Sequence, residues 1–180
     1  MSAPLRARAA DIIAGDVLHP QLAGSHFAHA ASIALPVRPT SALQVYLDMA
    51  RQAPRWLDGL MRVRNAGMRR LGMKDLGALR DVPATAPAGL QPGQRLGIFS
   101  VHTLSDDAVV LGDADRHLQV LLSLQLMPQA VGCELKMGCV VHLRRPFGRL
   151  YMLPVAPLHR RIVPHLLERY RRGMAAPATG

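Results

Sequence analysis

Two adjacent stretches of the chain, 117–127 and 133–143, alternate between apolar and polar side chains with a period of two residues. This period matches a β-strand, in which successive side chains point to opposite faces of a sheet. Because only one face of each stretch is apolar, both are predicted to be half-buried strands. The apolar positions are Leu118, Val120, Leu122, Leu124 and Leu126 in the first strand and Cys133, Leu135, Met137, Cys139, Val141 and Leu143 in the second.

The two stretches are close enough in sequence to pair as an antiparallel ribbon. Their apolar faces point the same way only if the numbers of paired residues add to an odd value, since the first strand is apolar at even positions and the second at odd positions. One register of this kind places Leu126 opposite Cys133. On the other face, the same register brings His117 opposite His142.

Three further segments are predicted to be strands, which makes five in all. The first, 26–35, is followed by two prolines that end it before a helix. The other two, 96–104 and 108–111, form a predicted hairpin around a turn of one serine and two aspartates. The proline- and alanine-rich stretch 77–93 is predicted to be a loop.

Three helices are predicted. Ser41 and Gln44 have capping-box spacing, so the first helix should begin there. Pro54 suits the first turn of the second helix, whose apolar stripe follows helical spacing. The third helix covers 151–170, where Pro164 predicts a kink unless the helix begins near that proline. The stripe of the second helix consists of Leu57, Leu60, Met61, Met68 and Leu71.

A chain of 180 residues is long enough for one domain with a substantial core. Residues 1–24 have no apolar period and are expected to form a loosely attached arm, although its apolar residues Ile12, Ile13, Val17 and Leu18 could dock. Residues 25–173 are expected to form a single α+β domain, in which a curved antiparallel sheet packs against a long C-terminal helix and two helices follow the first strand. Residues 174–180 are expected to be a flexible tail.

Charge and cysteine usage narrow the functional classes. The net charge of +10 would attract polyanions, but no recognition motif or aromatic stacking surface accompanies it, so we do not expect nucleic-acid binding. Cys133 and Cys139 lie about 20 Å apart along one predicted strand, too far for a disulfide. We expect a cytoplasmic protein. The thiols are expected to be reduced, the chain shows no recognisable secretory signal, and it has no apolar run of membrane-spanning length.

The densest polar cluster is GDADRHL at 112–118. In the register above, Asp115 and His117 share a face with His142, and two imidazoles with one carboxylate can hold a transition metal. Asp115 and His117 could alternatively act as acid and base, or simply form a hairpin entry, since aspartate favours turns. His26 and His29 could bind a metal only with a distant ligand. Common nucleotide, hydrolase, zinc and redox motifs are absent, and no cofactor is expected.

Four segments together resemble a bacterial family known only as a domain of unknown function, also found fused behind short-chain dehydrogenase-like domains. The resemblance implies a helix-grip, or START-like, fold, in which a curved sheet wraps a long C-terminal helix. Five predicted strands are two fewer than the seven of that fold. The matching segments are APRWLDGLMRVRN at 53–65, LGMKD at 71–75, VVLGDADRHL at 109–118 and GRLYMLPVAPLHRRIV at 148–163.

Such an arrangement would enclose an apolar cavity, so the leading expectation is binding of a small hydrophobic molecule. The same aromatic residues would equally serve a filled core. The alternatives are an interaction module for a partner oxidoreductase, and a cyclase- or hydrolase-type enzyme using Asp115 and His117. A cavity below about 300 Å³ would count against ligand binding. The oligomeric state is left open. Candidate ligand-binding residues are Trp56, Phe99, Tyr151 and His159 around the cavity and Arg116 or His117 as polar anchors.

Overall fold

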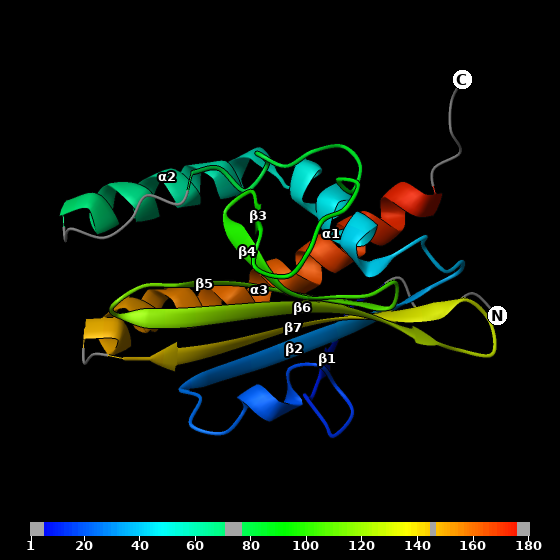
Figure 1. The fold of residues 1–180 in the computed structure, drawn as a ribbon, viewed down its shortest axis with the longest axis horizontal. Helices are drawn as coiled ribbons and strands as arrows, with labels where there is room; N and C mark the ends of the chain where they lie inside the picture. The colour runs from blue at the N-terminus through cyan, green and yellow to red at the C-terminus, as the bar shows by residue number, and fades with distance from the viewer. Residues whose placement is uncertain (1–5, 71–76, 145–146, 176–180) are drawn as a thin grey trace.

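The computed structural model describes residues 6–70, 77–144 and 147–175 (Figure 1). One seven-stranded antiparallel sheet lies under three α-helices, with strand order β1-β2-β7-β6-β5-β4-β3. The strands are β1 Arg8–Ala10, β2 Phe27–Leu35, β3 Arg95–Leu96, β4 Phe99–Leu104, β5 Ala108–Ala114, β6 Leu118–Pro128 and β7 Cys133–Leu143; the helices are α1 Ala42–Arg51, α2 Arg55–Arg70 and α3 Phe147–Ala175, with a short 3₁₀ turn at His19–Gln21.

The predicted count of five strands is wrong, because the described residues contain seven. The two strands that were missed, β1 and β3, have three and two residues. Strands so short carry too few side chains to display a period of two. β1 exists only because it pairs with β2, and β3 because it pairs with β4.

β6 and β7 form the predicted antiparallel ribbon, but the proposed register is wrong by two residues. Leu126 lies opposite Leu135, and Cys133 lies opposite Pro128. The numbers of paired residues still add to an odd value, so the apolar side chains of both strands point to the same face of the sheet, as expected. Because β6 continues to Pro128, only residues 129–132 remain for the loop, which closes through Gly132 at a φ of 73°.

The helices begin close to the predicted positions. The Ser41 side chain accepts a hydrogen bond from the Gln44 amide at 3.1 Å, which confirms the predicted N-cap of α1. α3 begins at Phe147, well before Pro164, and continues to Ala175, so residues 174 and 175, which were predicted to belong to a flexible tail, are helical. Leu71, the LGMKD segment 71–75 and residues 176–180 lie outside the described residues.

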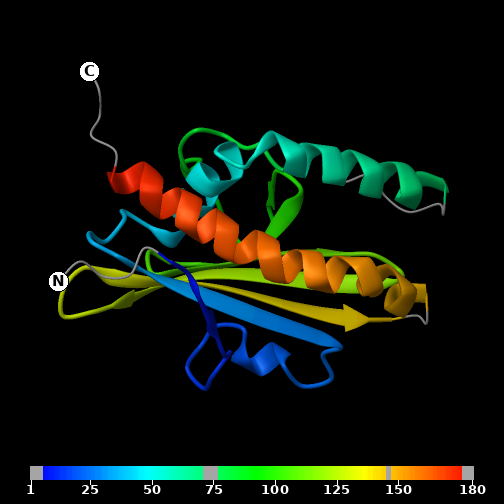
Figure 2. The same cartoon turned by 180° about the vertical axis from the view of Figure 1, so that it is seen from behind.

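The main core lies between the sheet and the helices. Even positions of β6 and odd positions of β7 face α1 and α3, as the alternation predicted. Phe27, Ala31, Ile33 and Leu35 of β2 extend the same face. In Figure 2, α3 crosses this face of the sheet along much of its length.

The N-terminal arm is not loosely attached, contrary to expectation. Residues 8–10 pair with β2, and Leu18 is 1% exposed on the sheet face opposite the helices. Leu18 packs there against side chains of β5, β6 and β7, and Gly138 leaves room for it, since a Cβ at that position would lie 3.2 Å from Leu18 Cδ1. Both sheet faces are therefore covered, one by helices and one by the arm (Figures 1 and 2).

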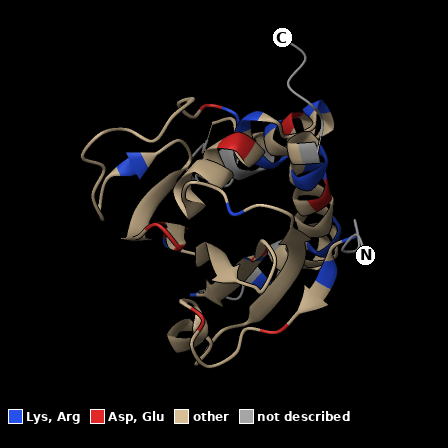
Figure 3. Ribbon diagram, turned by 90° about the vertical axis from the view of Figure 1, so that its right-hand side faces the viewer, with Lys and Arg blue, Asp and Glu red and all other residues tan. Residues whose placement is uncertain are grey.

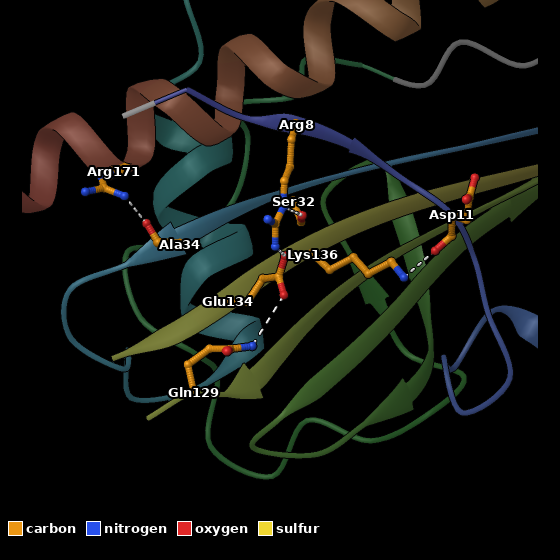
Figure 4. Close-up of polar contacts among 8 residues, drawn as sticks. All are labelled: Arg8, Asp11, Ser32, Ala34, Gln129, Glu134, Lys136 and Arg171. Atoms are coloured by element: carbon orange, nitrogen blue, oxygen red, sulfur yellow. Dashed lines mark hydrogen bonds and ion pairs between the residues drawn. The ribbon is translucent and has the colours of Figure 1, made fainter. Parts of the chain in front are cut away.

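Polar contacts attach the arm as well (Figure 4). Lys136 is buried on the arm side of β7, where its Nζ lies 2.6 Å from Asp16 Oδ2 and also donates to the Asp11 carbonyl. Arg8 pairs with Glu134 at 2.7 Å on the same face. The polar face of β7 is thus only partly exposed to solvent, because the arm folds over it.

Candidate functional site

A cavity of about 270 Å³ lies between the sheet and helices α2 and α3. Its floor is the core face of β2, β4, β5, β6 and β7, and its walls are the inner faces of the two helices. Most of the lining is aliphatic or thioether. The lining residues are Phe27, Leu57, Leu60, Met61, Arg64, Leu79, Ile98, Phe99, Asp113, Asp115, Leu118, Val120, Leu122, Met137, Cys139, Val141, Met152, Val155, Leu158, His159, Ile162, Val163 and Leu166.

Three of the charged or polar lining residues are engaged with other protein groups. Arg64 donates from Nη1 to Asn65 Oδ1 at 2.9 Å. Asp113 lies 3.7 Å from Arg95 Nη1, measured from its Oδ1. Asp115 Oδ1 accepts the amides of His117 and Leu118 at 2.6 and 2.9 Å and so closes the turn before β6.

The fourth polar lining residue, His159 of α3, belongs to a cluster of three rings. The His159 ring meets His29 and Phe27 edge to face, each at a centroid distance of 5.8 Å. His29 and Phe27 share the core face of β2, where His29 lies opposite Cys139 of β7. The Nδ1 atoms of both histidines are buried and have no hydrogen-bond partner among the described residues.

Burial sets the charge of this cluster. Desolvation, reinforced by the neighbouring His29, lowers the pKa of His159 to about 4. Desolvation and the Arg160 guanidinium lower the pKa of His29 as well. Both rings are therefore mainly neutral at pH 7. A neutral imidazole has one donor and one acceptor nitrogen.

Two further groups are uncharged at neutral pH: Cys139, which lines the cavity, and Tyr46, which lies behind the lining residue Phe99. Burial raises the pKa of the Cys139 thiol to about 12, so this sulfur is a poor nucleophile at neutral pH. Tyr46 of α1 packs against Phe99 at a centroid distance of 6.4 Å, and burial raises its pKa. The core side of the cavity therefore presents neutral groups.

Three of the residues singled out from the sequence line the cavity: Phe99, Asp115 and His159. Trp56 does not; its side chain is 48% exposed and packs beside the His165 ring of α3. Arg116 is exposed and donates to His117 Nε2 at 2.9 Å, so neither residue is an anchor inside the cavity. Tyr151 is part of α3, but its side chain lies outside the described residues.

The predicted metal arrangement does not form. His142 lies opposite Gln119 and not His117, because of the two-residue change in register. Asp115 is held by backbone amides, and within residues 6–70, 77–144 and 147–175 no three His, Cys, Asp or Glu side chains come together as metal ligands. His26 points elsewhere too, since its Nδ1 accepts from the Leu143 amide.

The pairing of His29 with His159 was not predicted from the sequence. A signal was present, because Phe27, His29, Ile33 and Leu35 occupy alternate positions and put His29 on an apolar strand face. Its partner lies 130 residues away on α3, and no local pattern joins the two.

The surface carries the positive charge. α2 has five arginines and α3 has six, and Figure 3 shows many of the basic residues along these helices. Arg169 and Arg171 donate to carbonyl groups of Gln52 and Ala34, so part of this charge holds α3 in place. No helix in the described part of the chain has the length and apolar character needed to cross a membrane.

Over the residues that the structure describes, these features define an α+β protein with a seven-stranded antiparallel sheet and three α-helices, of which the long α3 lies at the C-terminal end. Residues 21–166 match the sequence profile of the family described as "Protein of unknown function (DUF2867)", and the chain belongs to that family. Comparison with curated proteins gives no match. The matched range includes every residue of the cavity lining.

Proposed function

We propose that this domain binds a small hydrophobic molecule in the cavity between the sheet and helices α2 and α3. The observation that carries the proposal is the apolar lining, which combines aliphatic side chains with a few polar groups, as small-molecule sites do. The volume of about 270 Å³ is below the roughly 300 Å³ set above, so by volume alone the cavity counts against ligand binding. Met61, Met137 and Met152 line the cavity, and flexible thioether chains can shift to enlarge it.

The proposal includes a helix-grip arrangement, in which the sheet curves around α3. Seven strands, the number expected of that fold, support it. The position of β2 beside β7 also supports it. This pairing places a strand from near the start of the chain beside the strand that directly precedes α3. α2 would then be the wall that a ligand must pass.

Native mass spectrometry of freshly purified full-length protein tests the proposal. We expect a co-purified small molecule in the wild type. Met61→Trp should reduce its occupancy at least tenfold, because an indole at this lining position fills the cavity. Val63→Trp is the matched control on the same helix, since Val63 is 73% exposed.

Two results would contradict ligand binding. One is the absence of any bound mass in the wild type under conditions that preserve noncovalent complexes. The other is equal occupancy in Met61→Trp and Val63→Trp, which would place the bound molecule elsewhere.

A second candidate function is an interaction module for a partner oxidoreductase. Trp56, Val63 and Leu153 favour it, because these side chains on α2 and α3 are 48%, 73% and 70% exposed. An interaction module without ligand predicts no co-purified small molecule. It also predicts that Val63→Asp abolishes capture of the partner while leaving the melting temperature unchanged.

A further inference from the structure

Two carboxylates line a cavity that is otherwise mostly apolar. Asp113 belongs to β5, and Asp115 follows two positions later, directly after the end of that strand. Arg64 is the only cationic side chain among the described lining residues, and the His159 ring is neutral at pH 7. The lining therefore has an excess of negative charge, although the chain as a whole carries a net charge of +10.

Asp113 is the less satisfied of the two carboxylates. Its side chain is 13% exposed, and its ion-pair partner is Arg95, whose Nη1 lies 3.7 Å from Oδ1. That distance is too long for a hydrogen bond, so within residues 6–70, 77–144 and 147–175 neither oxygen of Asp113 accepts one. Both oxygens keep some accessible surface, since neither is among the fully buried polar atoms that lack a partner. Asp113 thus presents an accessible carboxylate at the cavity.

The neighbouring cations do not occupy this carboxylate. Arg95 does not line the cavity; its side chain is 45% exposed, and its Nη2 donates to the Ile98 carbonyl at 2.9 Å. Arg64 donates from Nη1 to Asn65 Oδ1. An ion pair with one half-exposed partner and no hydrogen bond is weak. A ligand cation can therefore approach Asp113 without breaking a strong interaction.

The chemistry of the carboxylate selects the polar group of the ligand. A carboxylate accepts hydrogen bonds and donates none, and its bonds to a charged donor are shorter and stronger than those to a neutral donor. An ammonium group supplies such a donor together with the opposite charge. An anionic head group would be repelled by Asp113 and by Asp115, and a hydroxyl would supply only a neutral donor.

We propose that the ligand of this cavity is a hydrophobic amine, whose ammonium group donates to Asp113 and whose hydrocarbon part lies against the aliphatic lining. This inference rests on the proposed function, since it specifies the ligand class of the same cavity. Asp115 adds to the negative potential at the ammonium, although its Oδ1 is occupied by two backbone amides.

Three probes with the same C8 chain test this class at pH 7: octylammonium, octanoate and 1-octanol. Dissociation constants are measured by NMR titration of the full chain at about 0.15 M salt, which screens long-range attraction to the surface. We expect octylammonium to bind about tenfold more tightly than 1-octanol and octanoate to bind most weakly. This order is opposite to the one that the net charge of +10 would favour. It is read on the unmodified protein, so it is independent of any effect of a substitution on folding.

Asp113→Asn should weaken octylammonium binding about tenfold, strengthen octanoate binding and leave 1-octanol within about twofold. Asp106→Asn is the matched control. It removes the same charge from the exposed turn between β4 and β5, and Asp106 does not line the cavity. Met61→Trp, which fills the cavity, should weaken all three probes alike.

The outcomes separate this inference from the proposed function. Octanoate or 1-octanol binding at least as tightly as octylammonium would overturn the amine ligand while the cavity remained a binding site. Equal octylammonium affinity in Asp113→Asn and Asp106→Asn would do the same. Failure of all three probes to bind the wild type, or binding that Met61→Trp leaves unchanged, would overturn both.

Discussion

His29 and His159 meet edge to face under α3, 130 positions apart in the chain. Each ring alone would be an ordinary histidine that titrates near pH 6.5. Together in the core they are desolvated, and the pKa of His159 falls to about 4. At the residue scale, this pair makes the stability of the fold sensitive to acid.

We expect the free energy of unfolding to fall as the pH decreases from 6.5 to 4. In this window the unfolded chain protonates His159 while the folded protein does not, so protons favour unfolding. The contribution of this residue is about 3 kcal/mol, present above pH 6.5 and lost near pH 4. Urea denaturation at a series of pH values measures it.

His159→Phe should remove most of that pH dependence, whereas His165→Phe should retain it. The comparison is between variants at each pH, since carboxylates titrate in the same range. Identical pH profiles for the wild type and His159→Phe would mean that His159 is not the residue responsible.

At the scale of elements, the start of α1 was predictable because its cap is local. Ser41 and Gln44 are three residues apart, and the hydrogen bond between them needs no tertiary contact. The Gln44 side chain, in contrast, bonds to Asp48 and to the Ala84 carbonyl and not back to residue 41. Only half of the predicted capping box forms.

Ser41→Ala should lower the free energy of unfolding by about 1 kcal/mol, since it removes the acceptor for the Gln44 amide. Chemical denaturation monitored by circular dichroism measures this. Thr85→Ala, in the exposed loop before β3, is the control and should change stability by much less. A loss for Ser41→Ala no larger than for Thr85→Ala would show that the cap contributes nothing to stability.

At the scale of the whole molecule, the sheet is buried on both faces. Helices cover one face, and the N-terminal arm covers the other through Leu18 and the buried pair of Lys136 and Asp16. The side chains of that pair are 8% and 6% exposed, so each charge depends on the other for compensation. The arm is thus part of the domain core.

Lys136→Met should lower the free energy of unfolding by about 3–5 kcal/mol, because it leaves the Asp16 carboxylate buried without its cation. The double variant Lys136→Met with Asp16→Leu should recover most of the loss. Arg8→Met breaks an ion pair on the same face whose arginine side chain is 72% exposed, and should cost far less. Equal losses for Lys136→Met and Arg8→Met would show that the arm is not held through Lys136.

The sequence by itself determined which face of each long strand enters the core, where α1 begins and that a long helix ends the domain. These features are local: side-chain alternation, cap spacing and helical period act within a few residues. The tertiary structure alone decided the β6–β7 register. Every register in which the numbers of paired residues add to an odd value puts both apolar faces on the same side, and only the length of the loop selects one of these registers. It also decided the strands β1 and β3, the docking of the arm and the meeting of His29 with His159, because each depends on a partner distant in the chain.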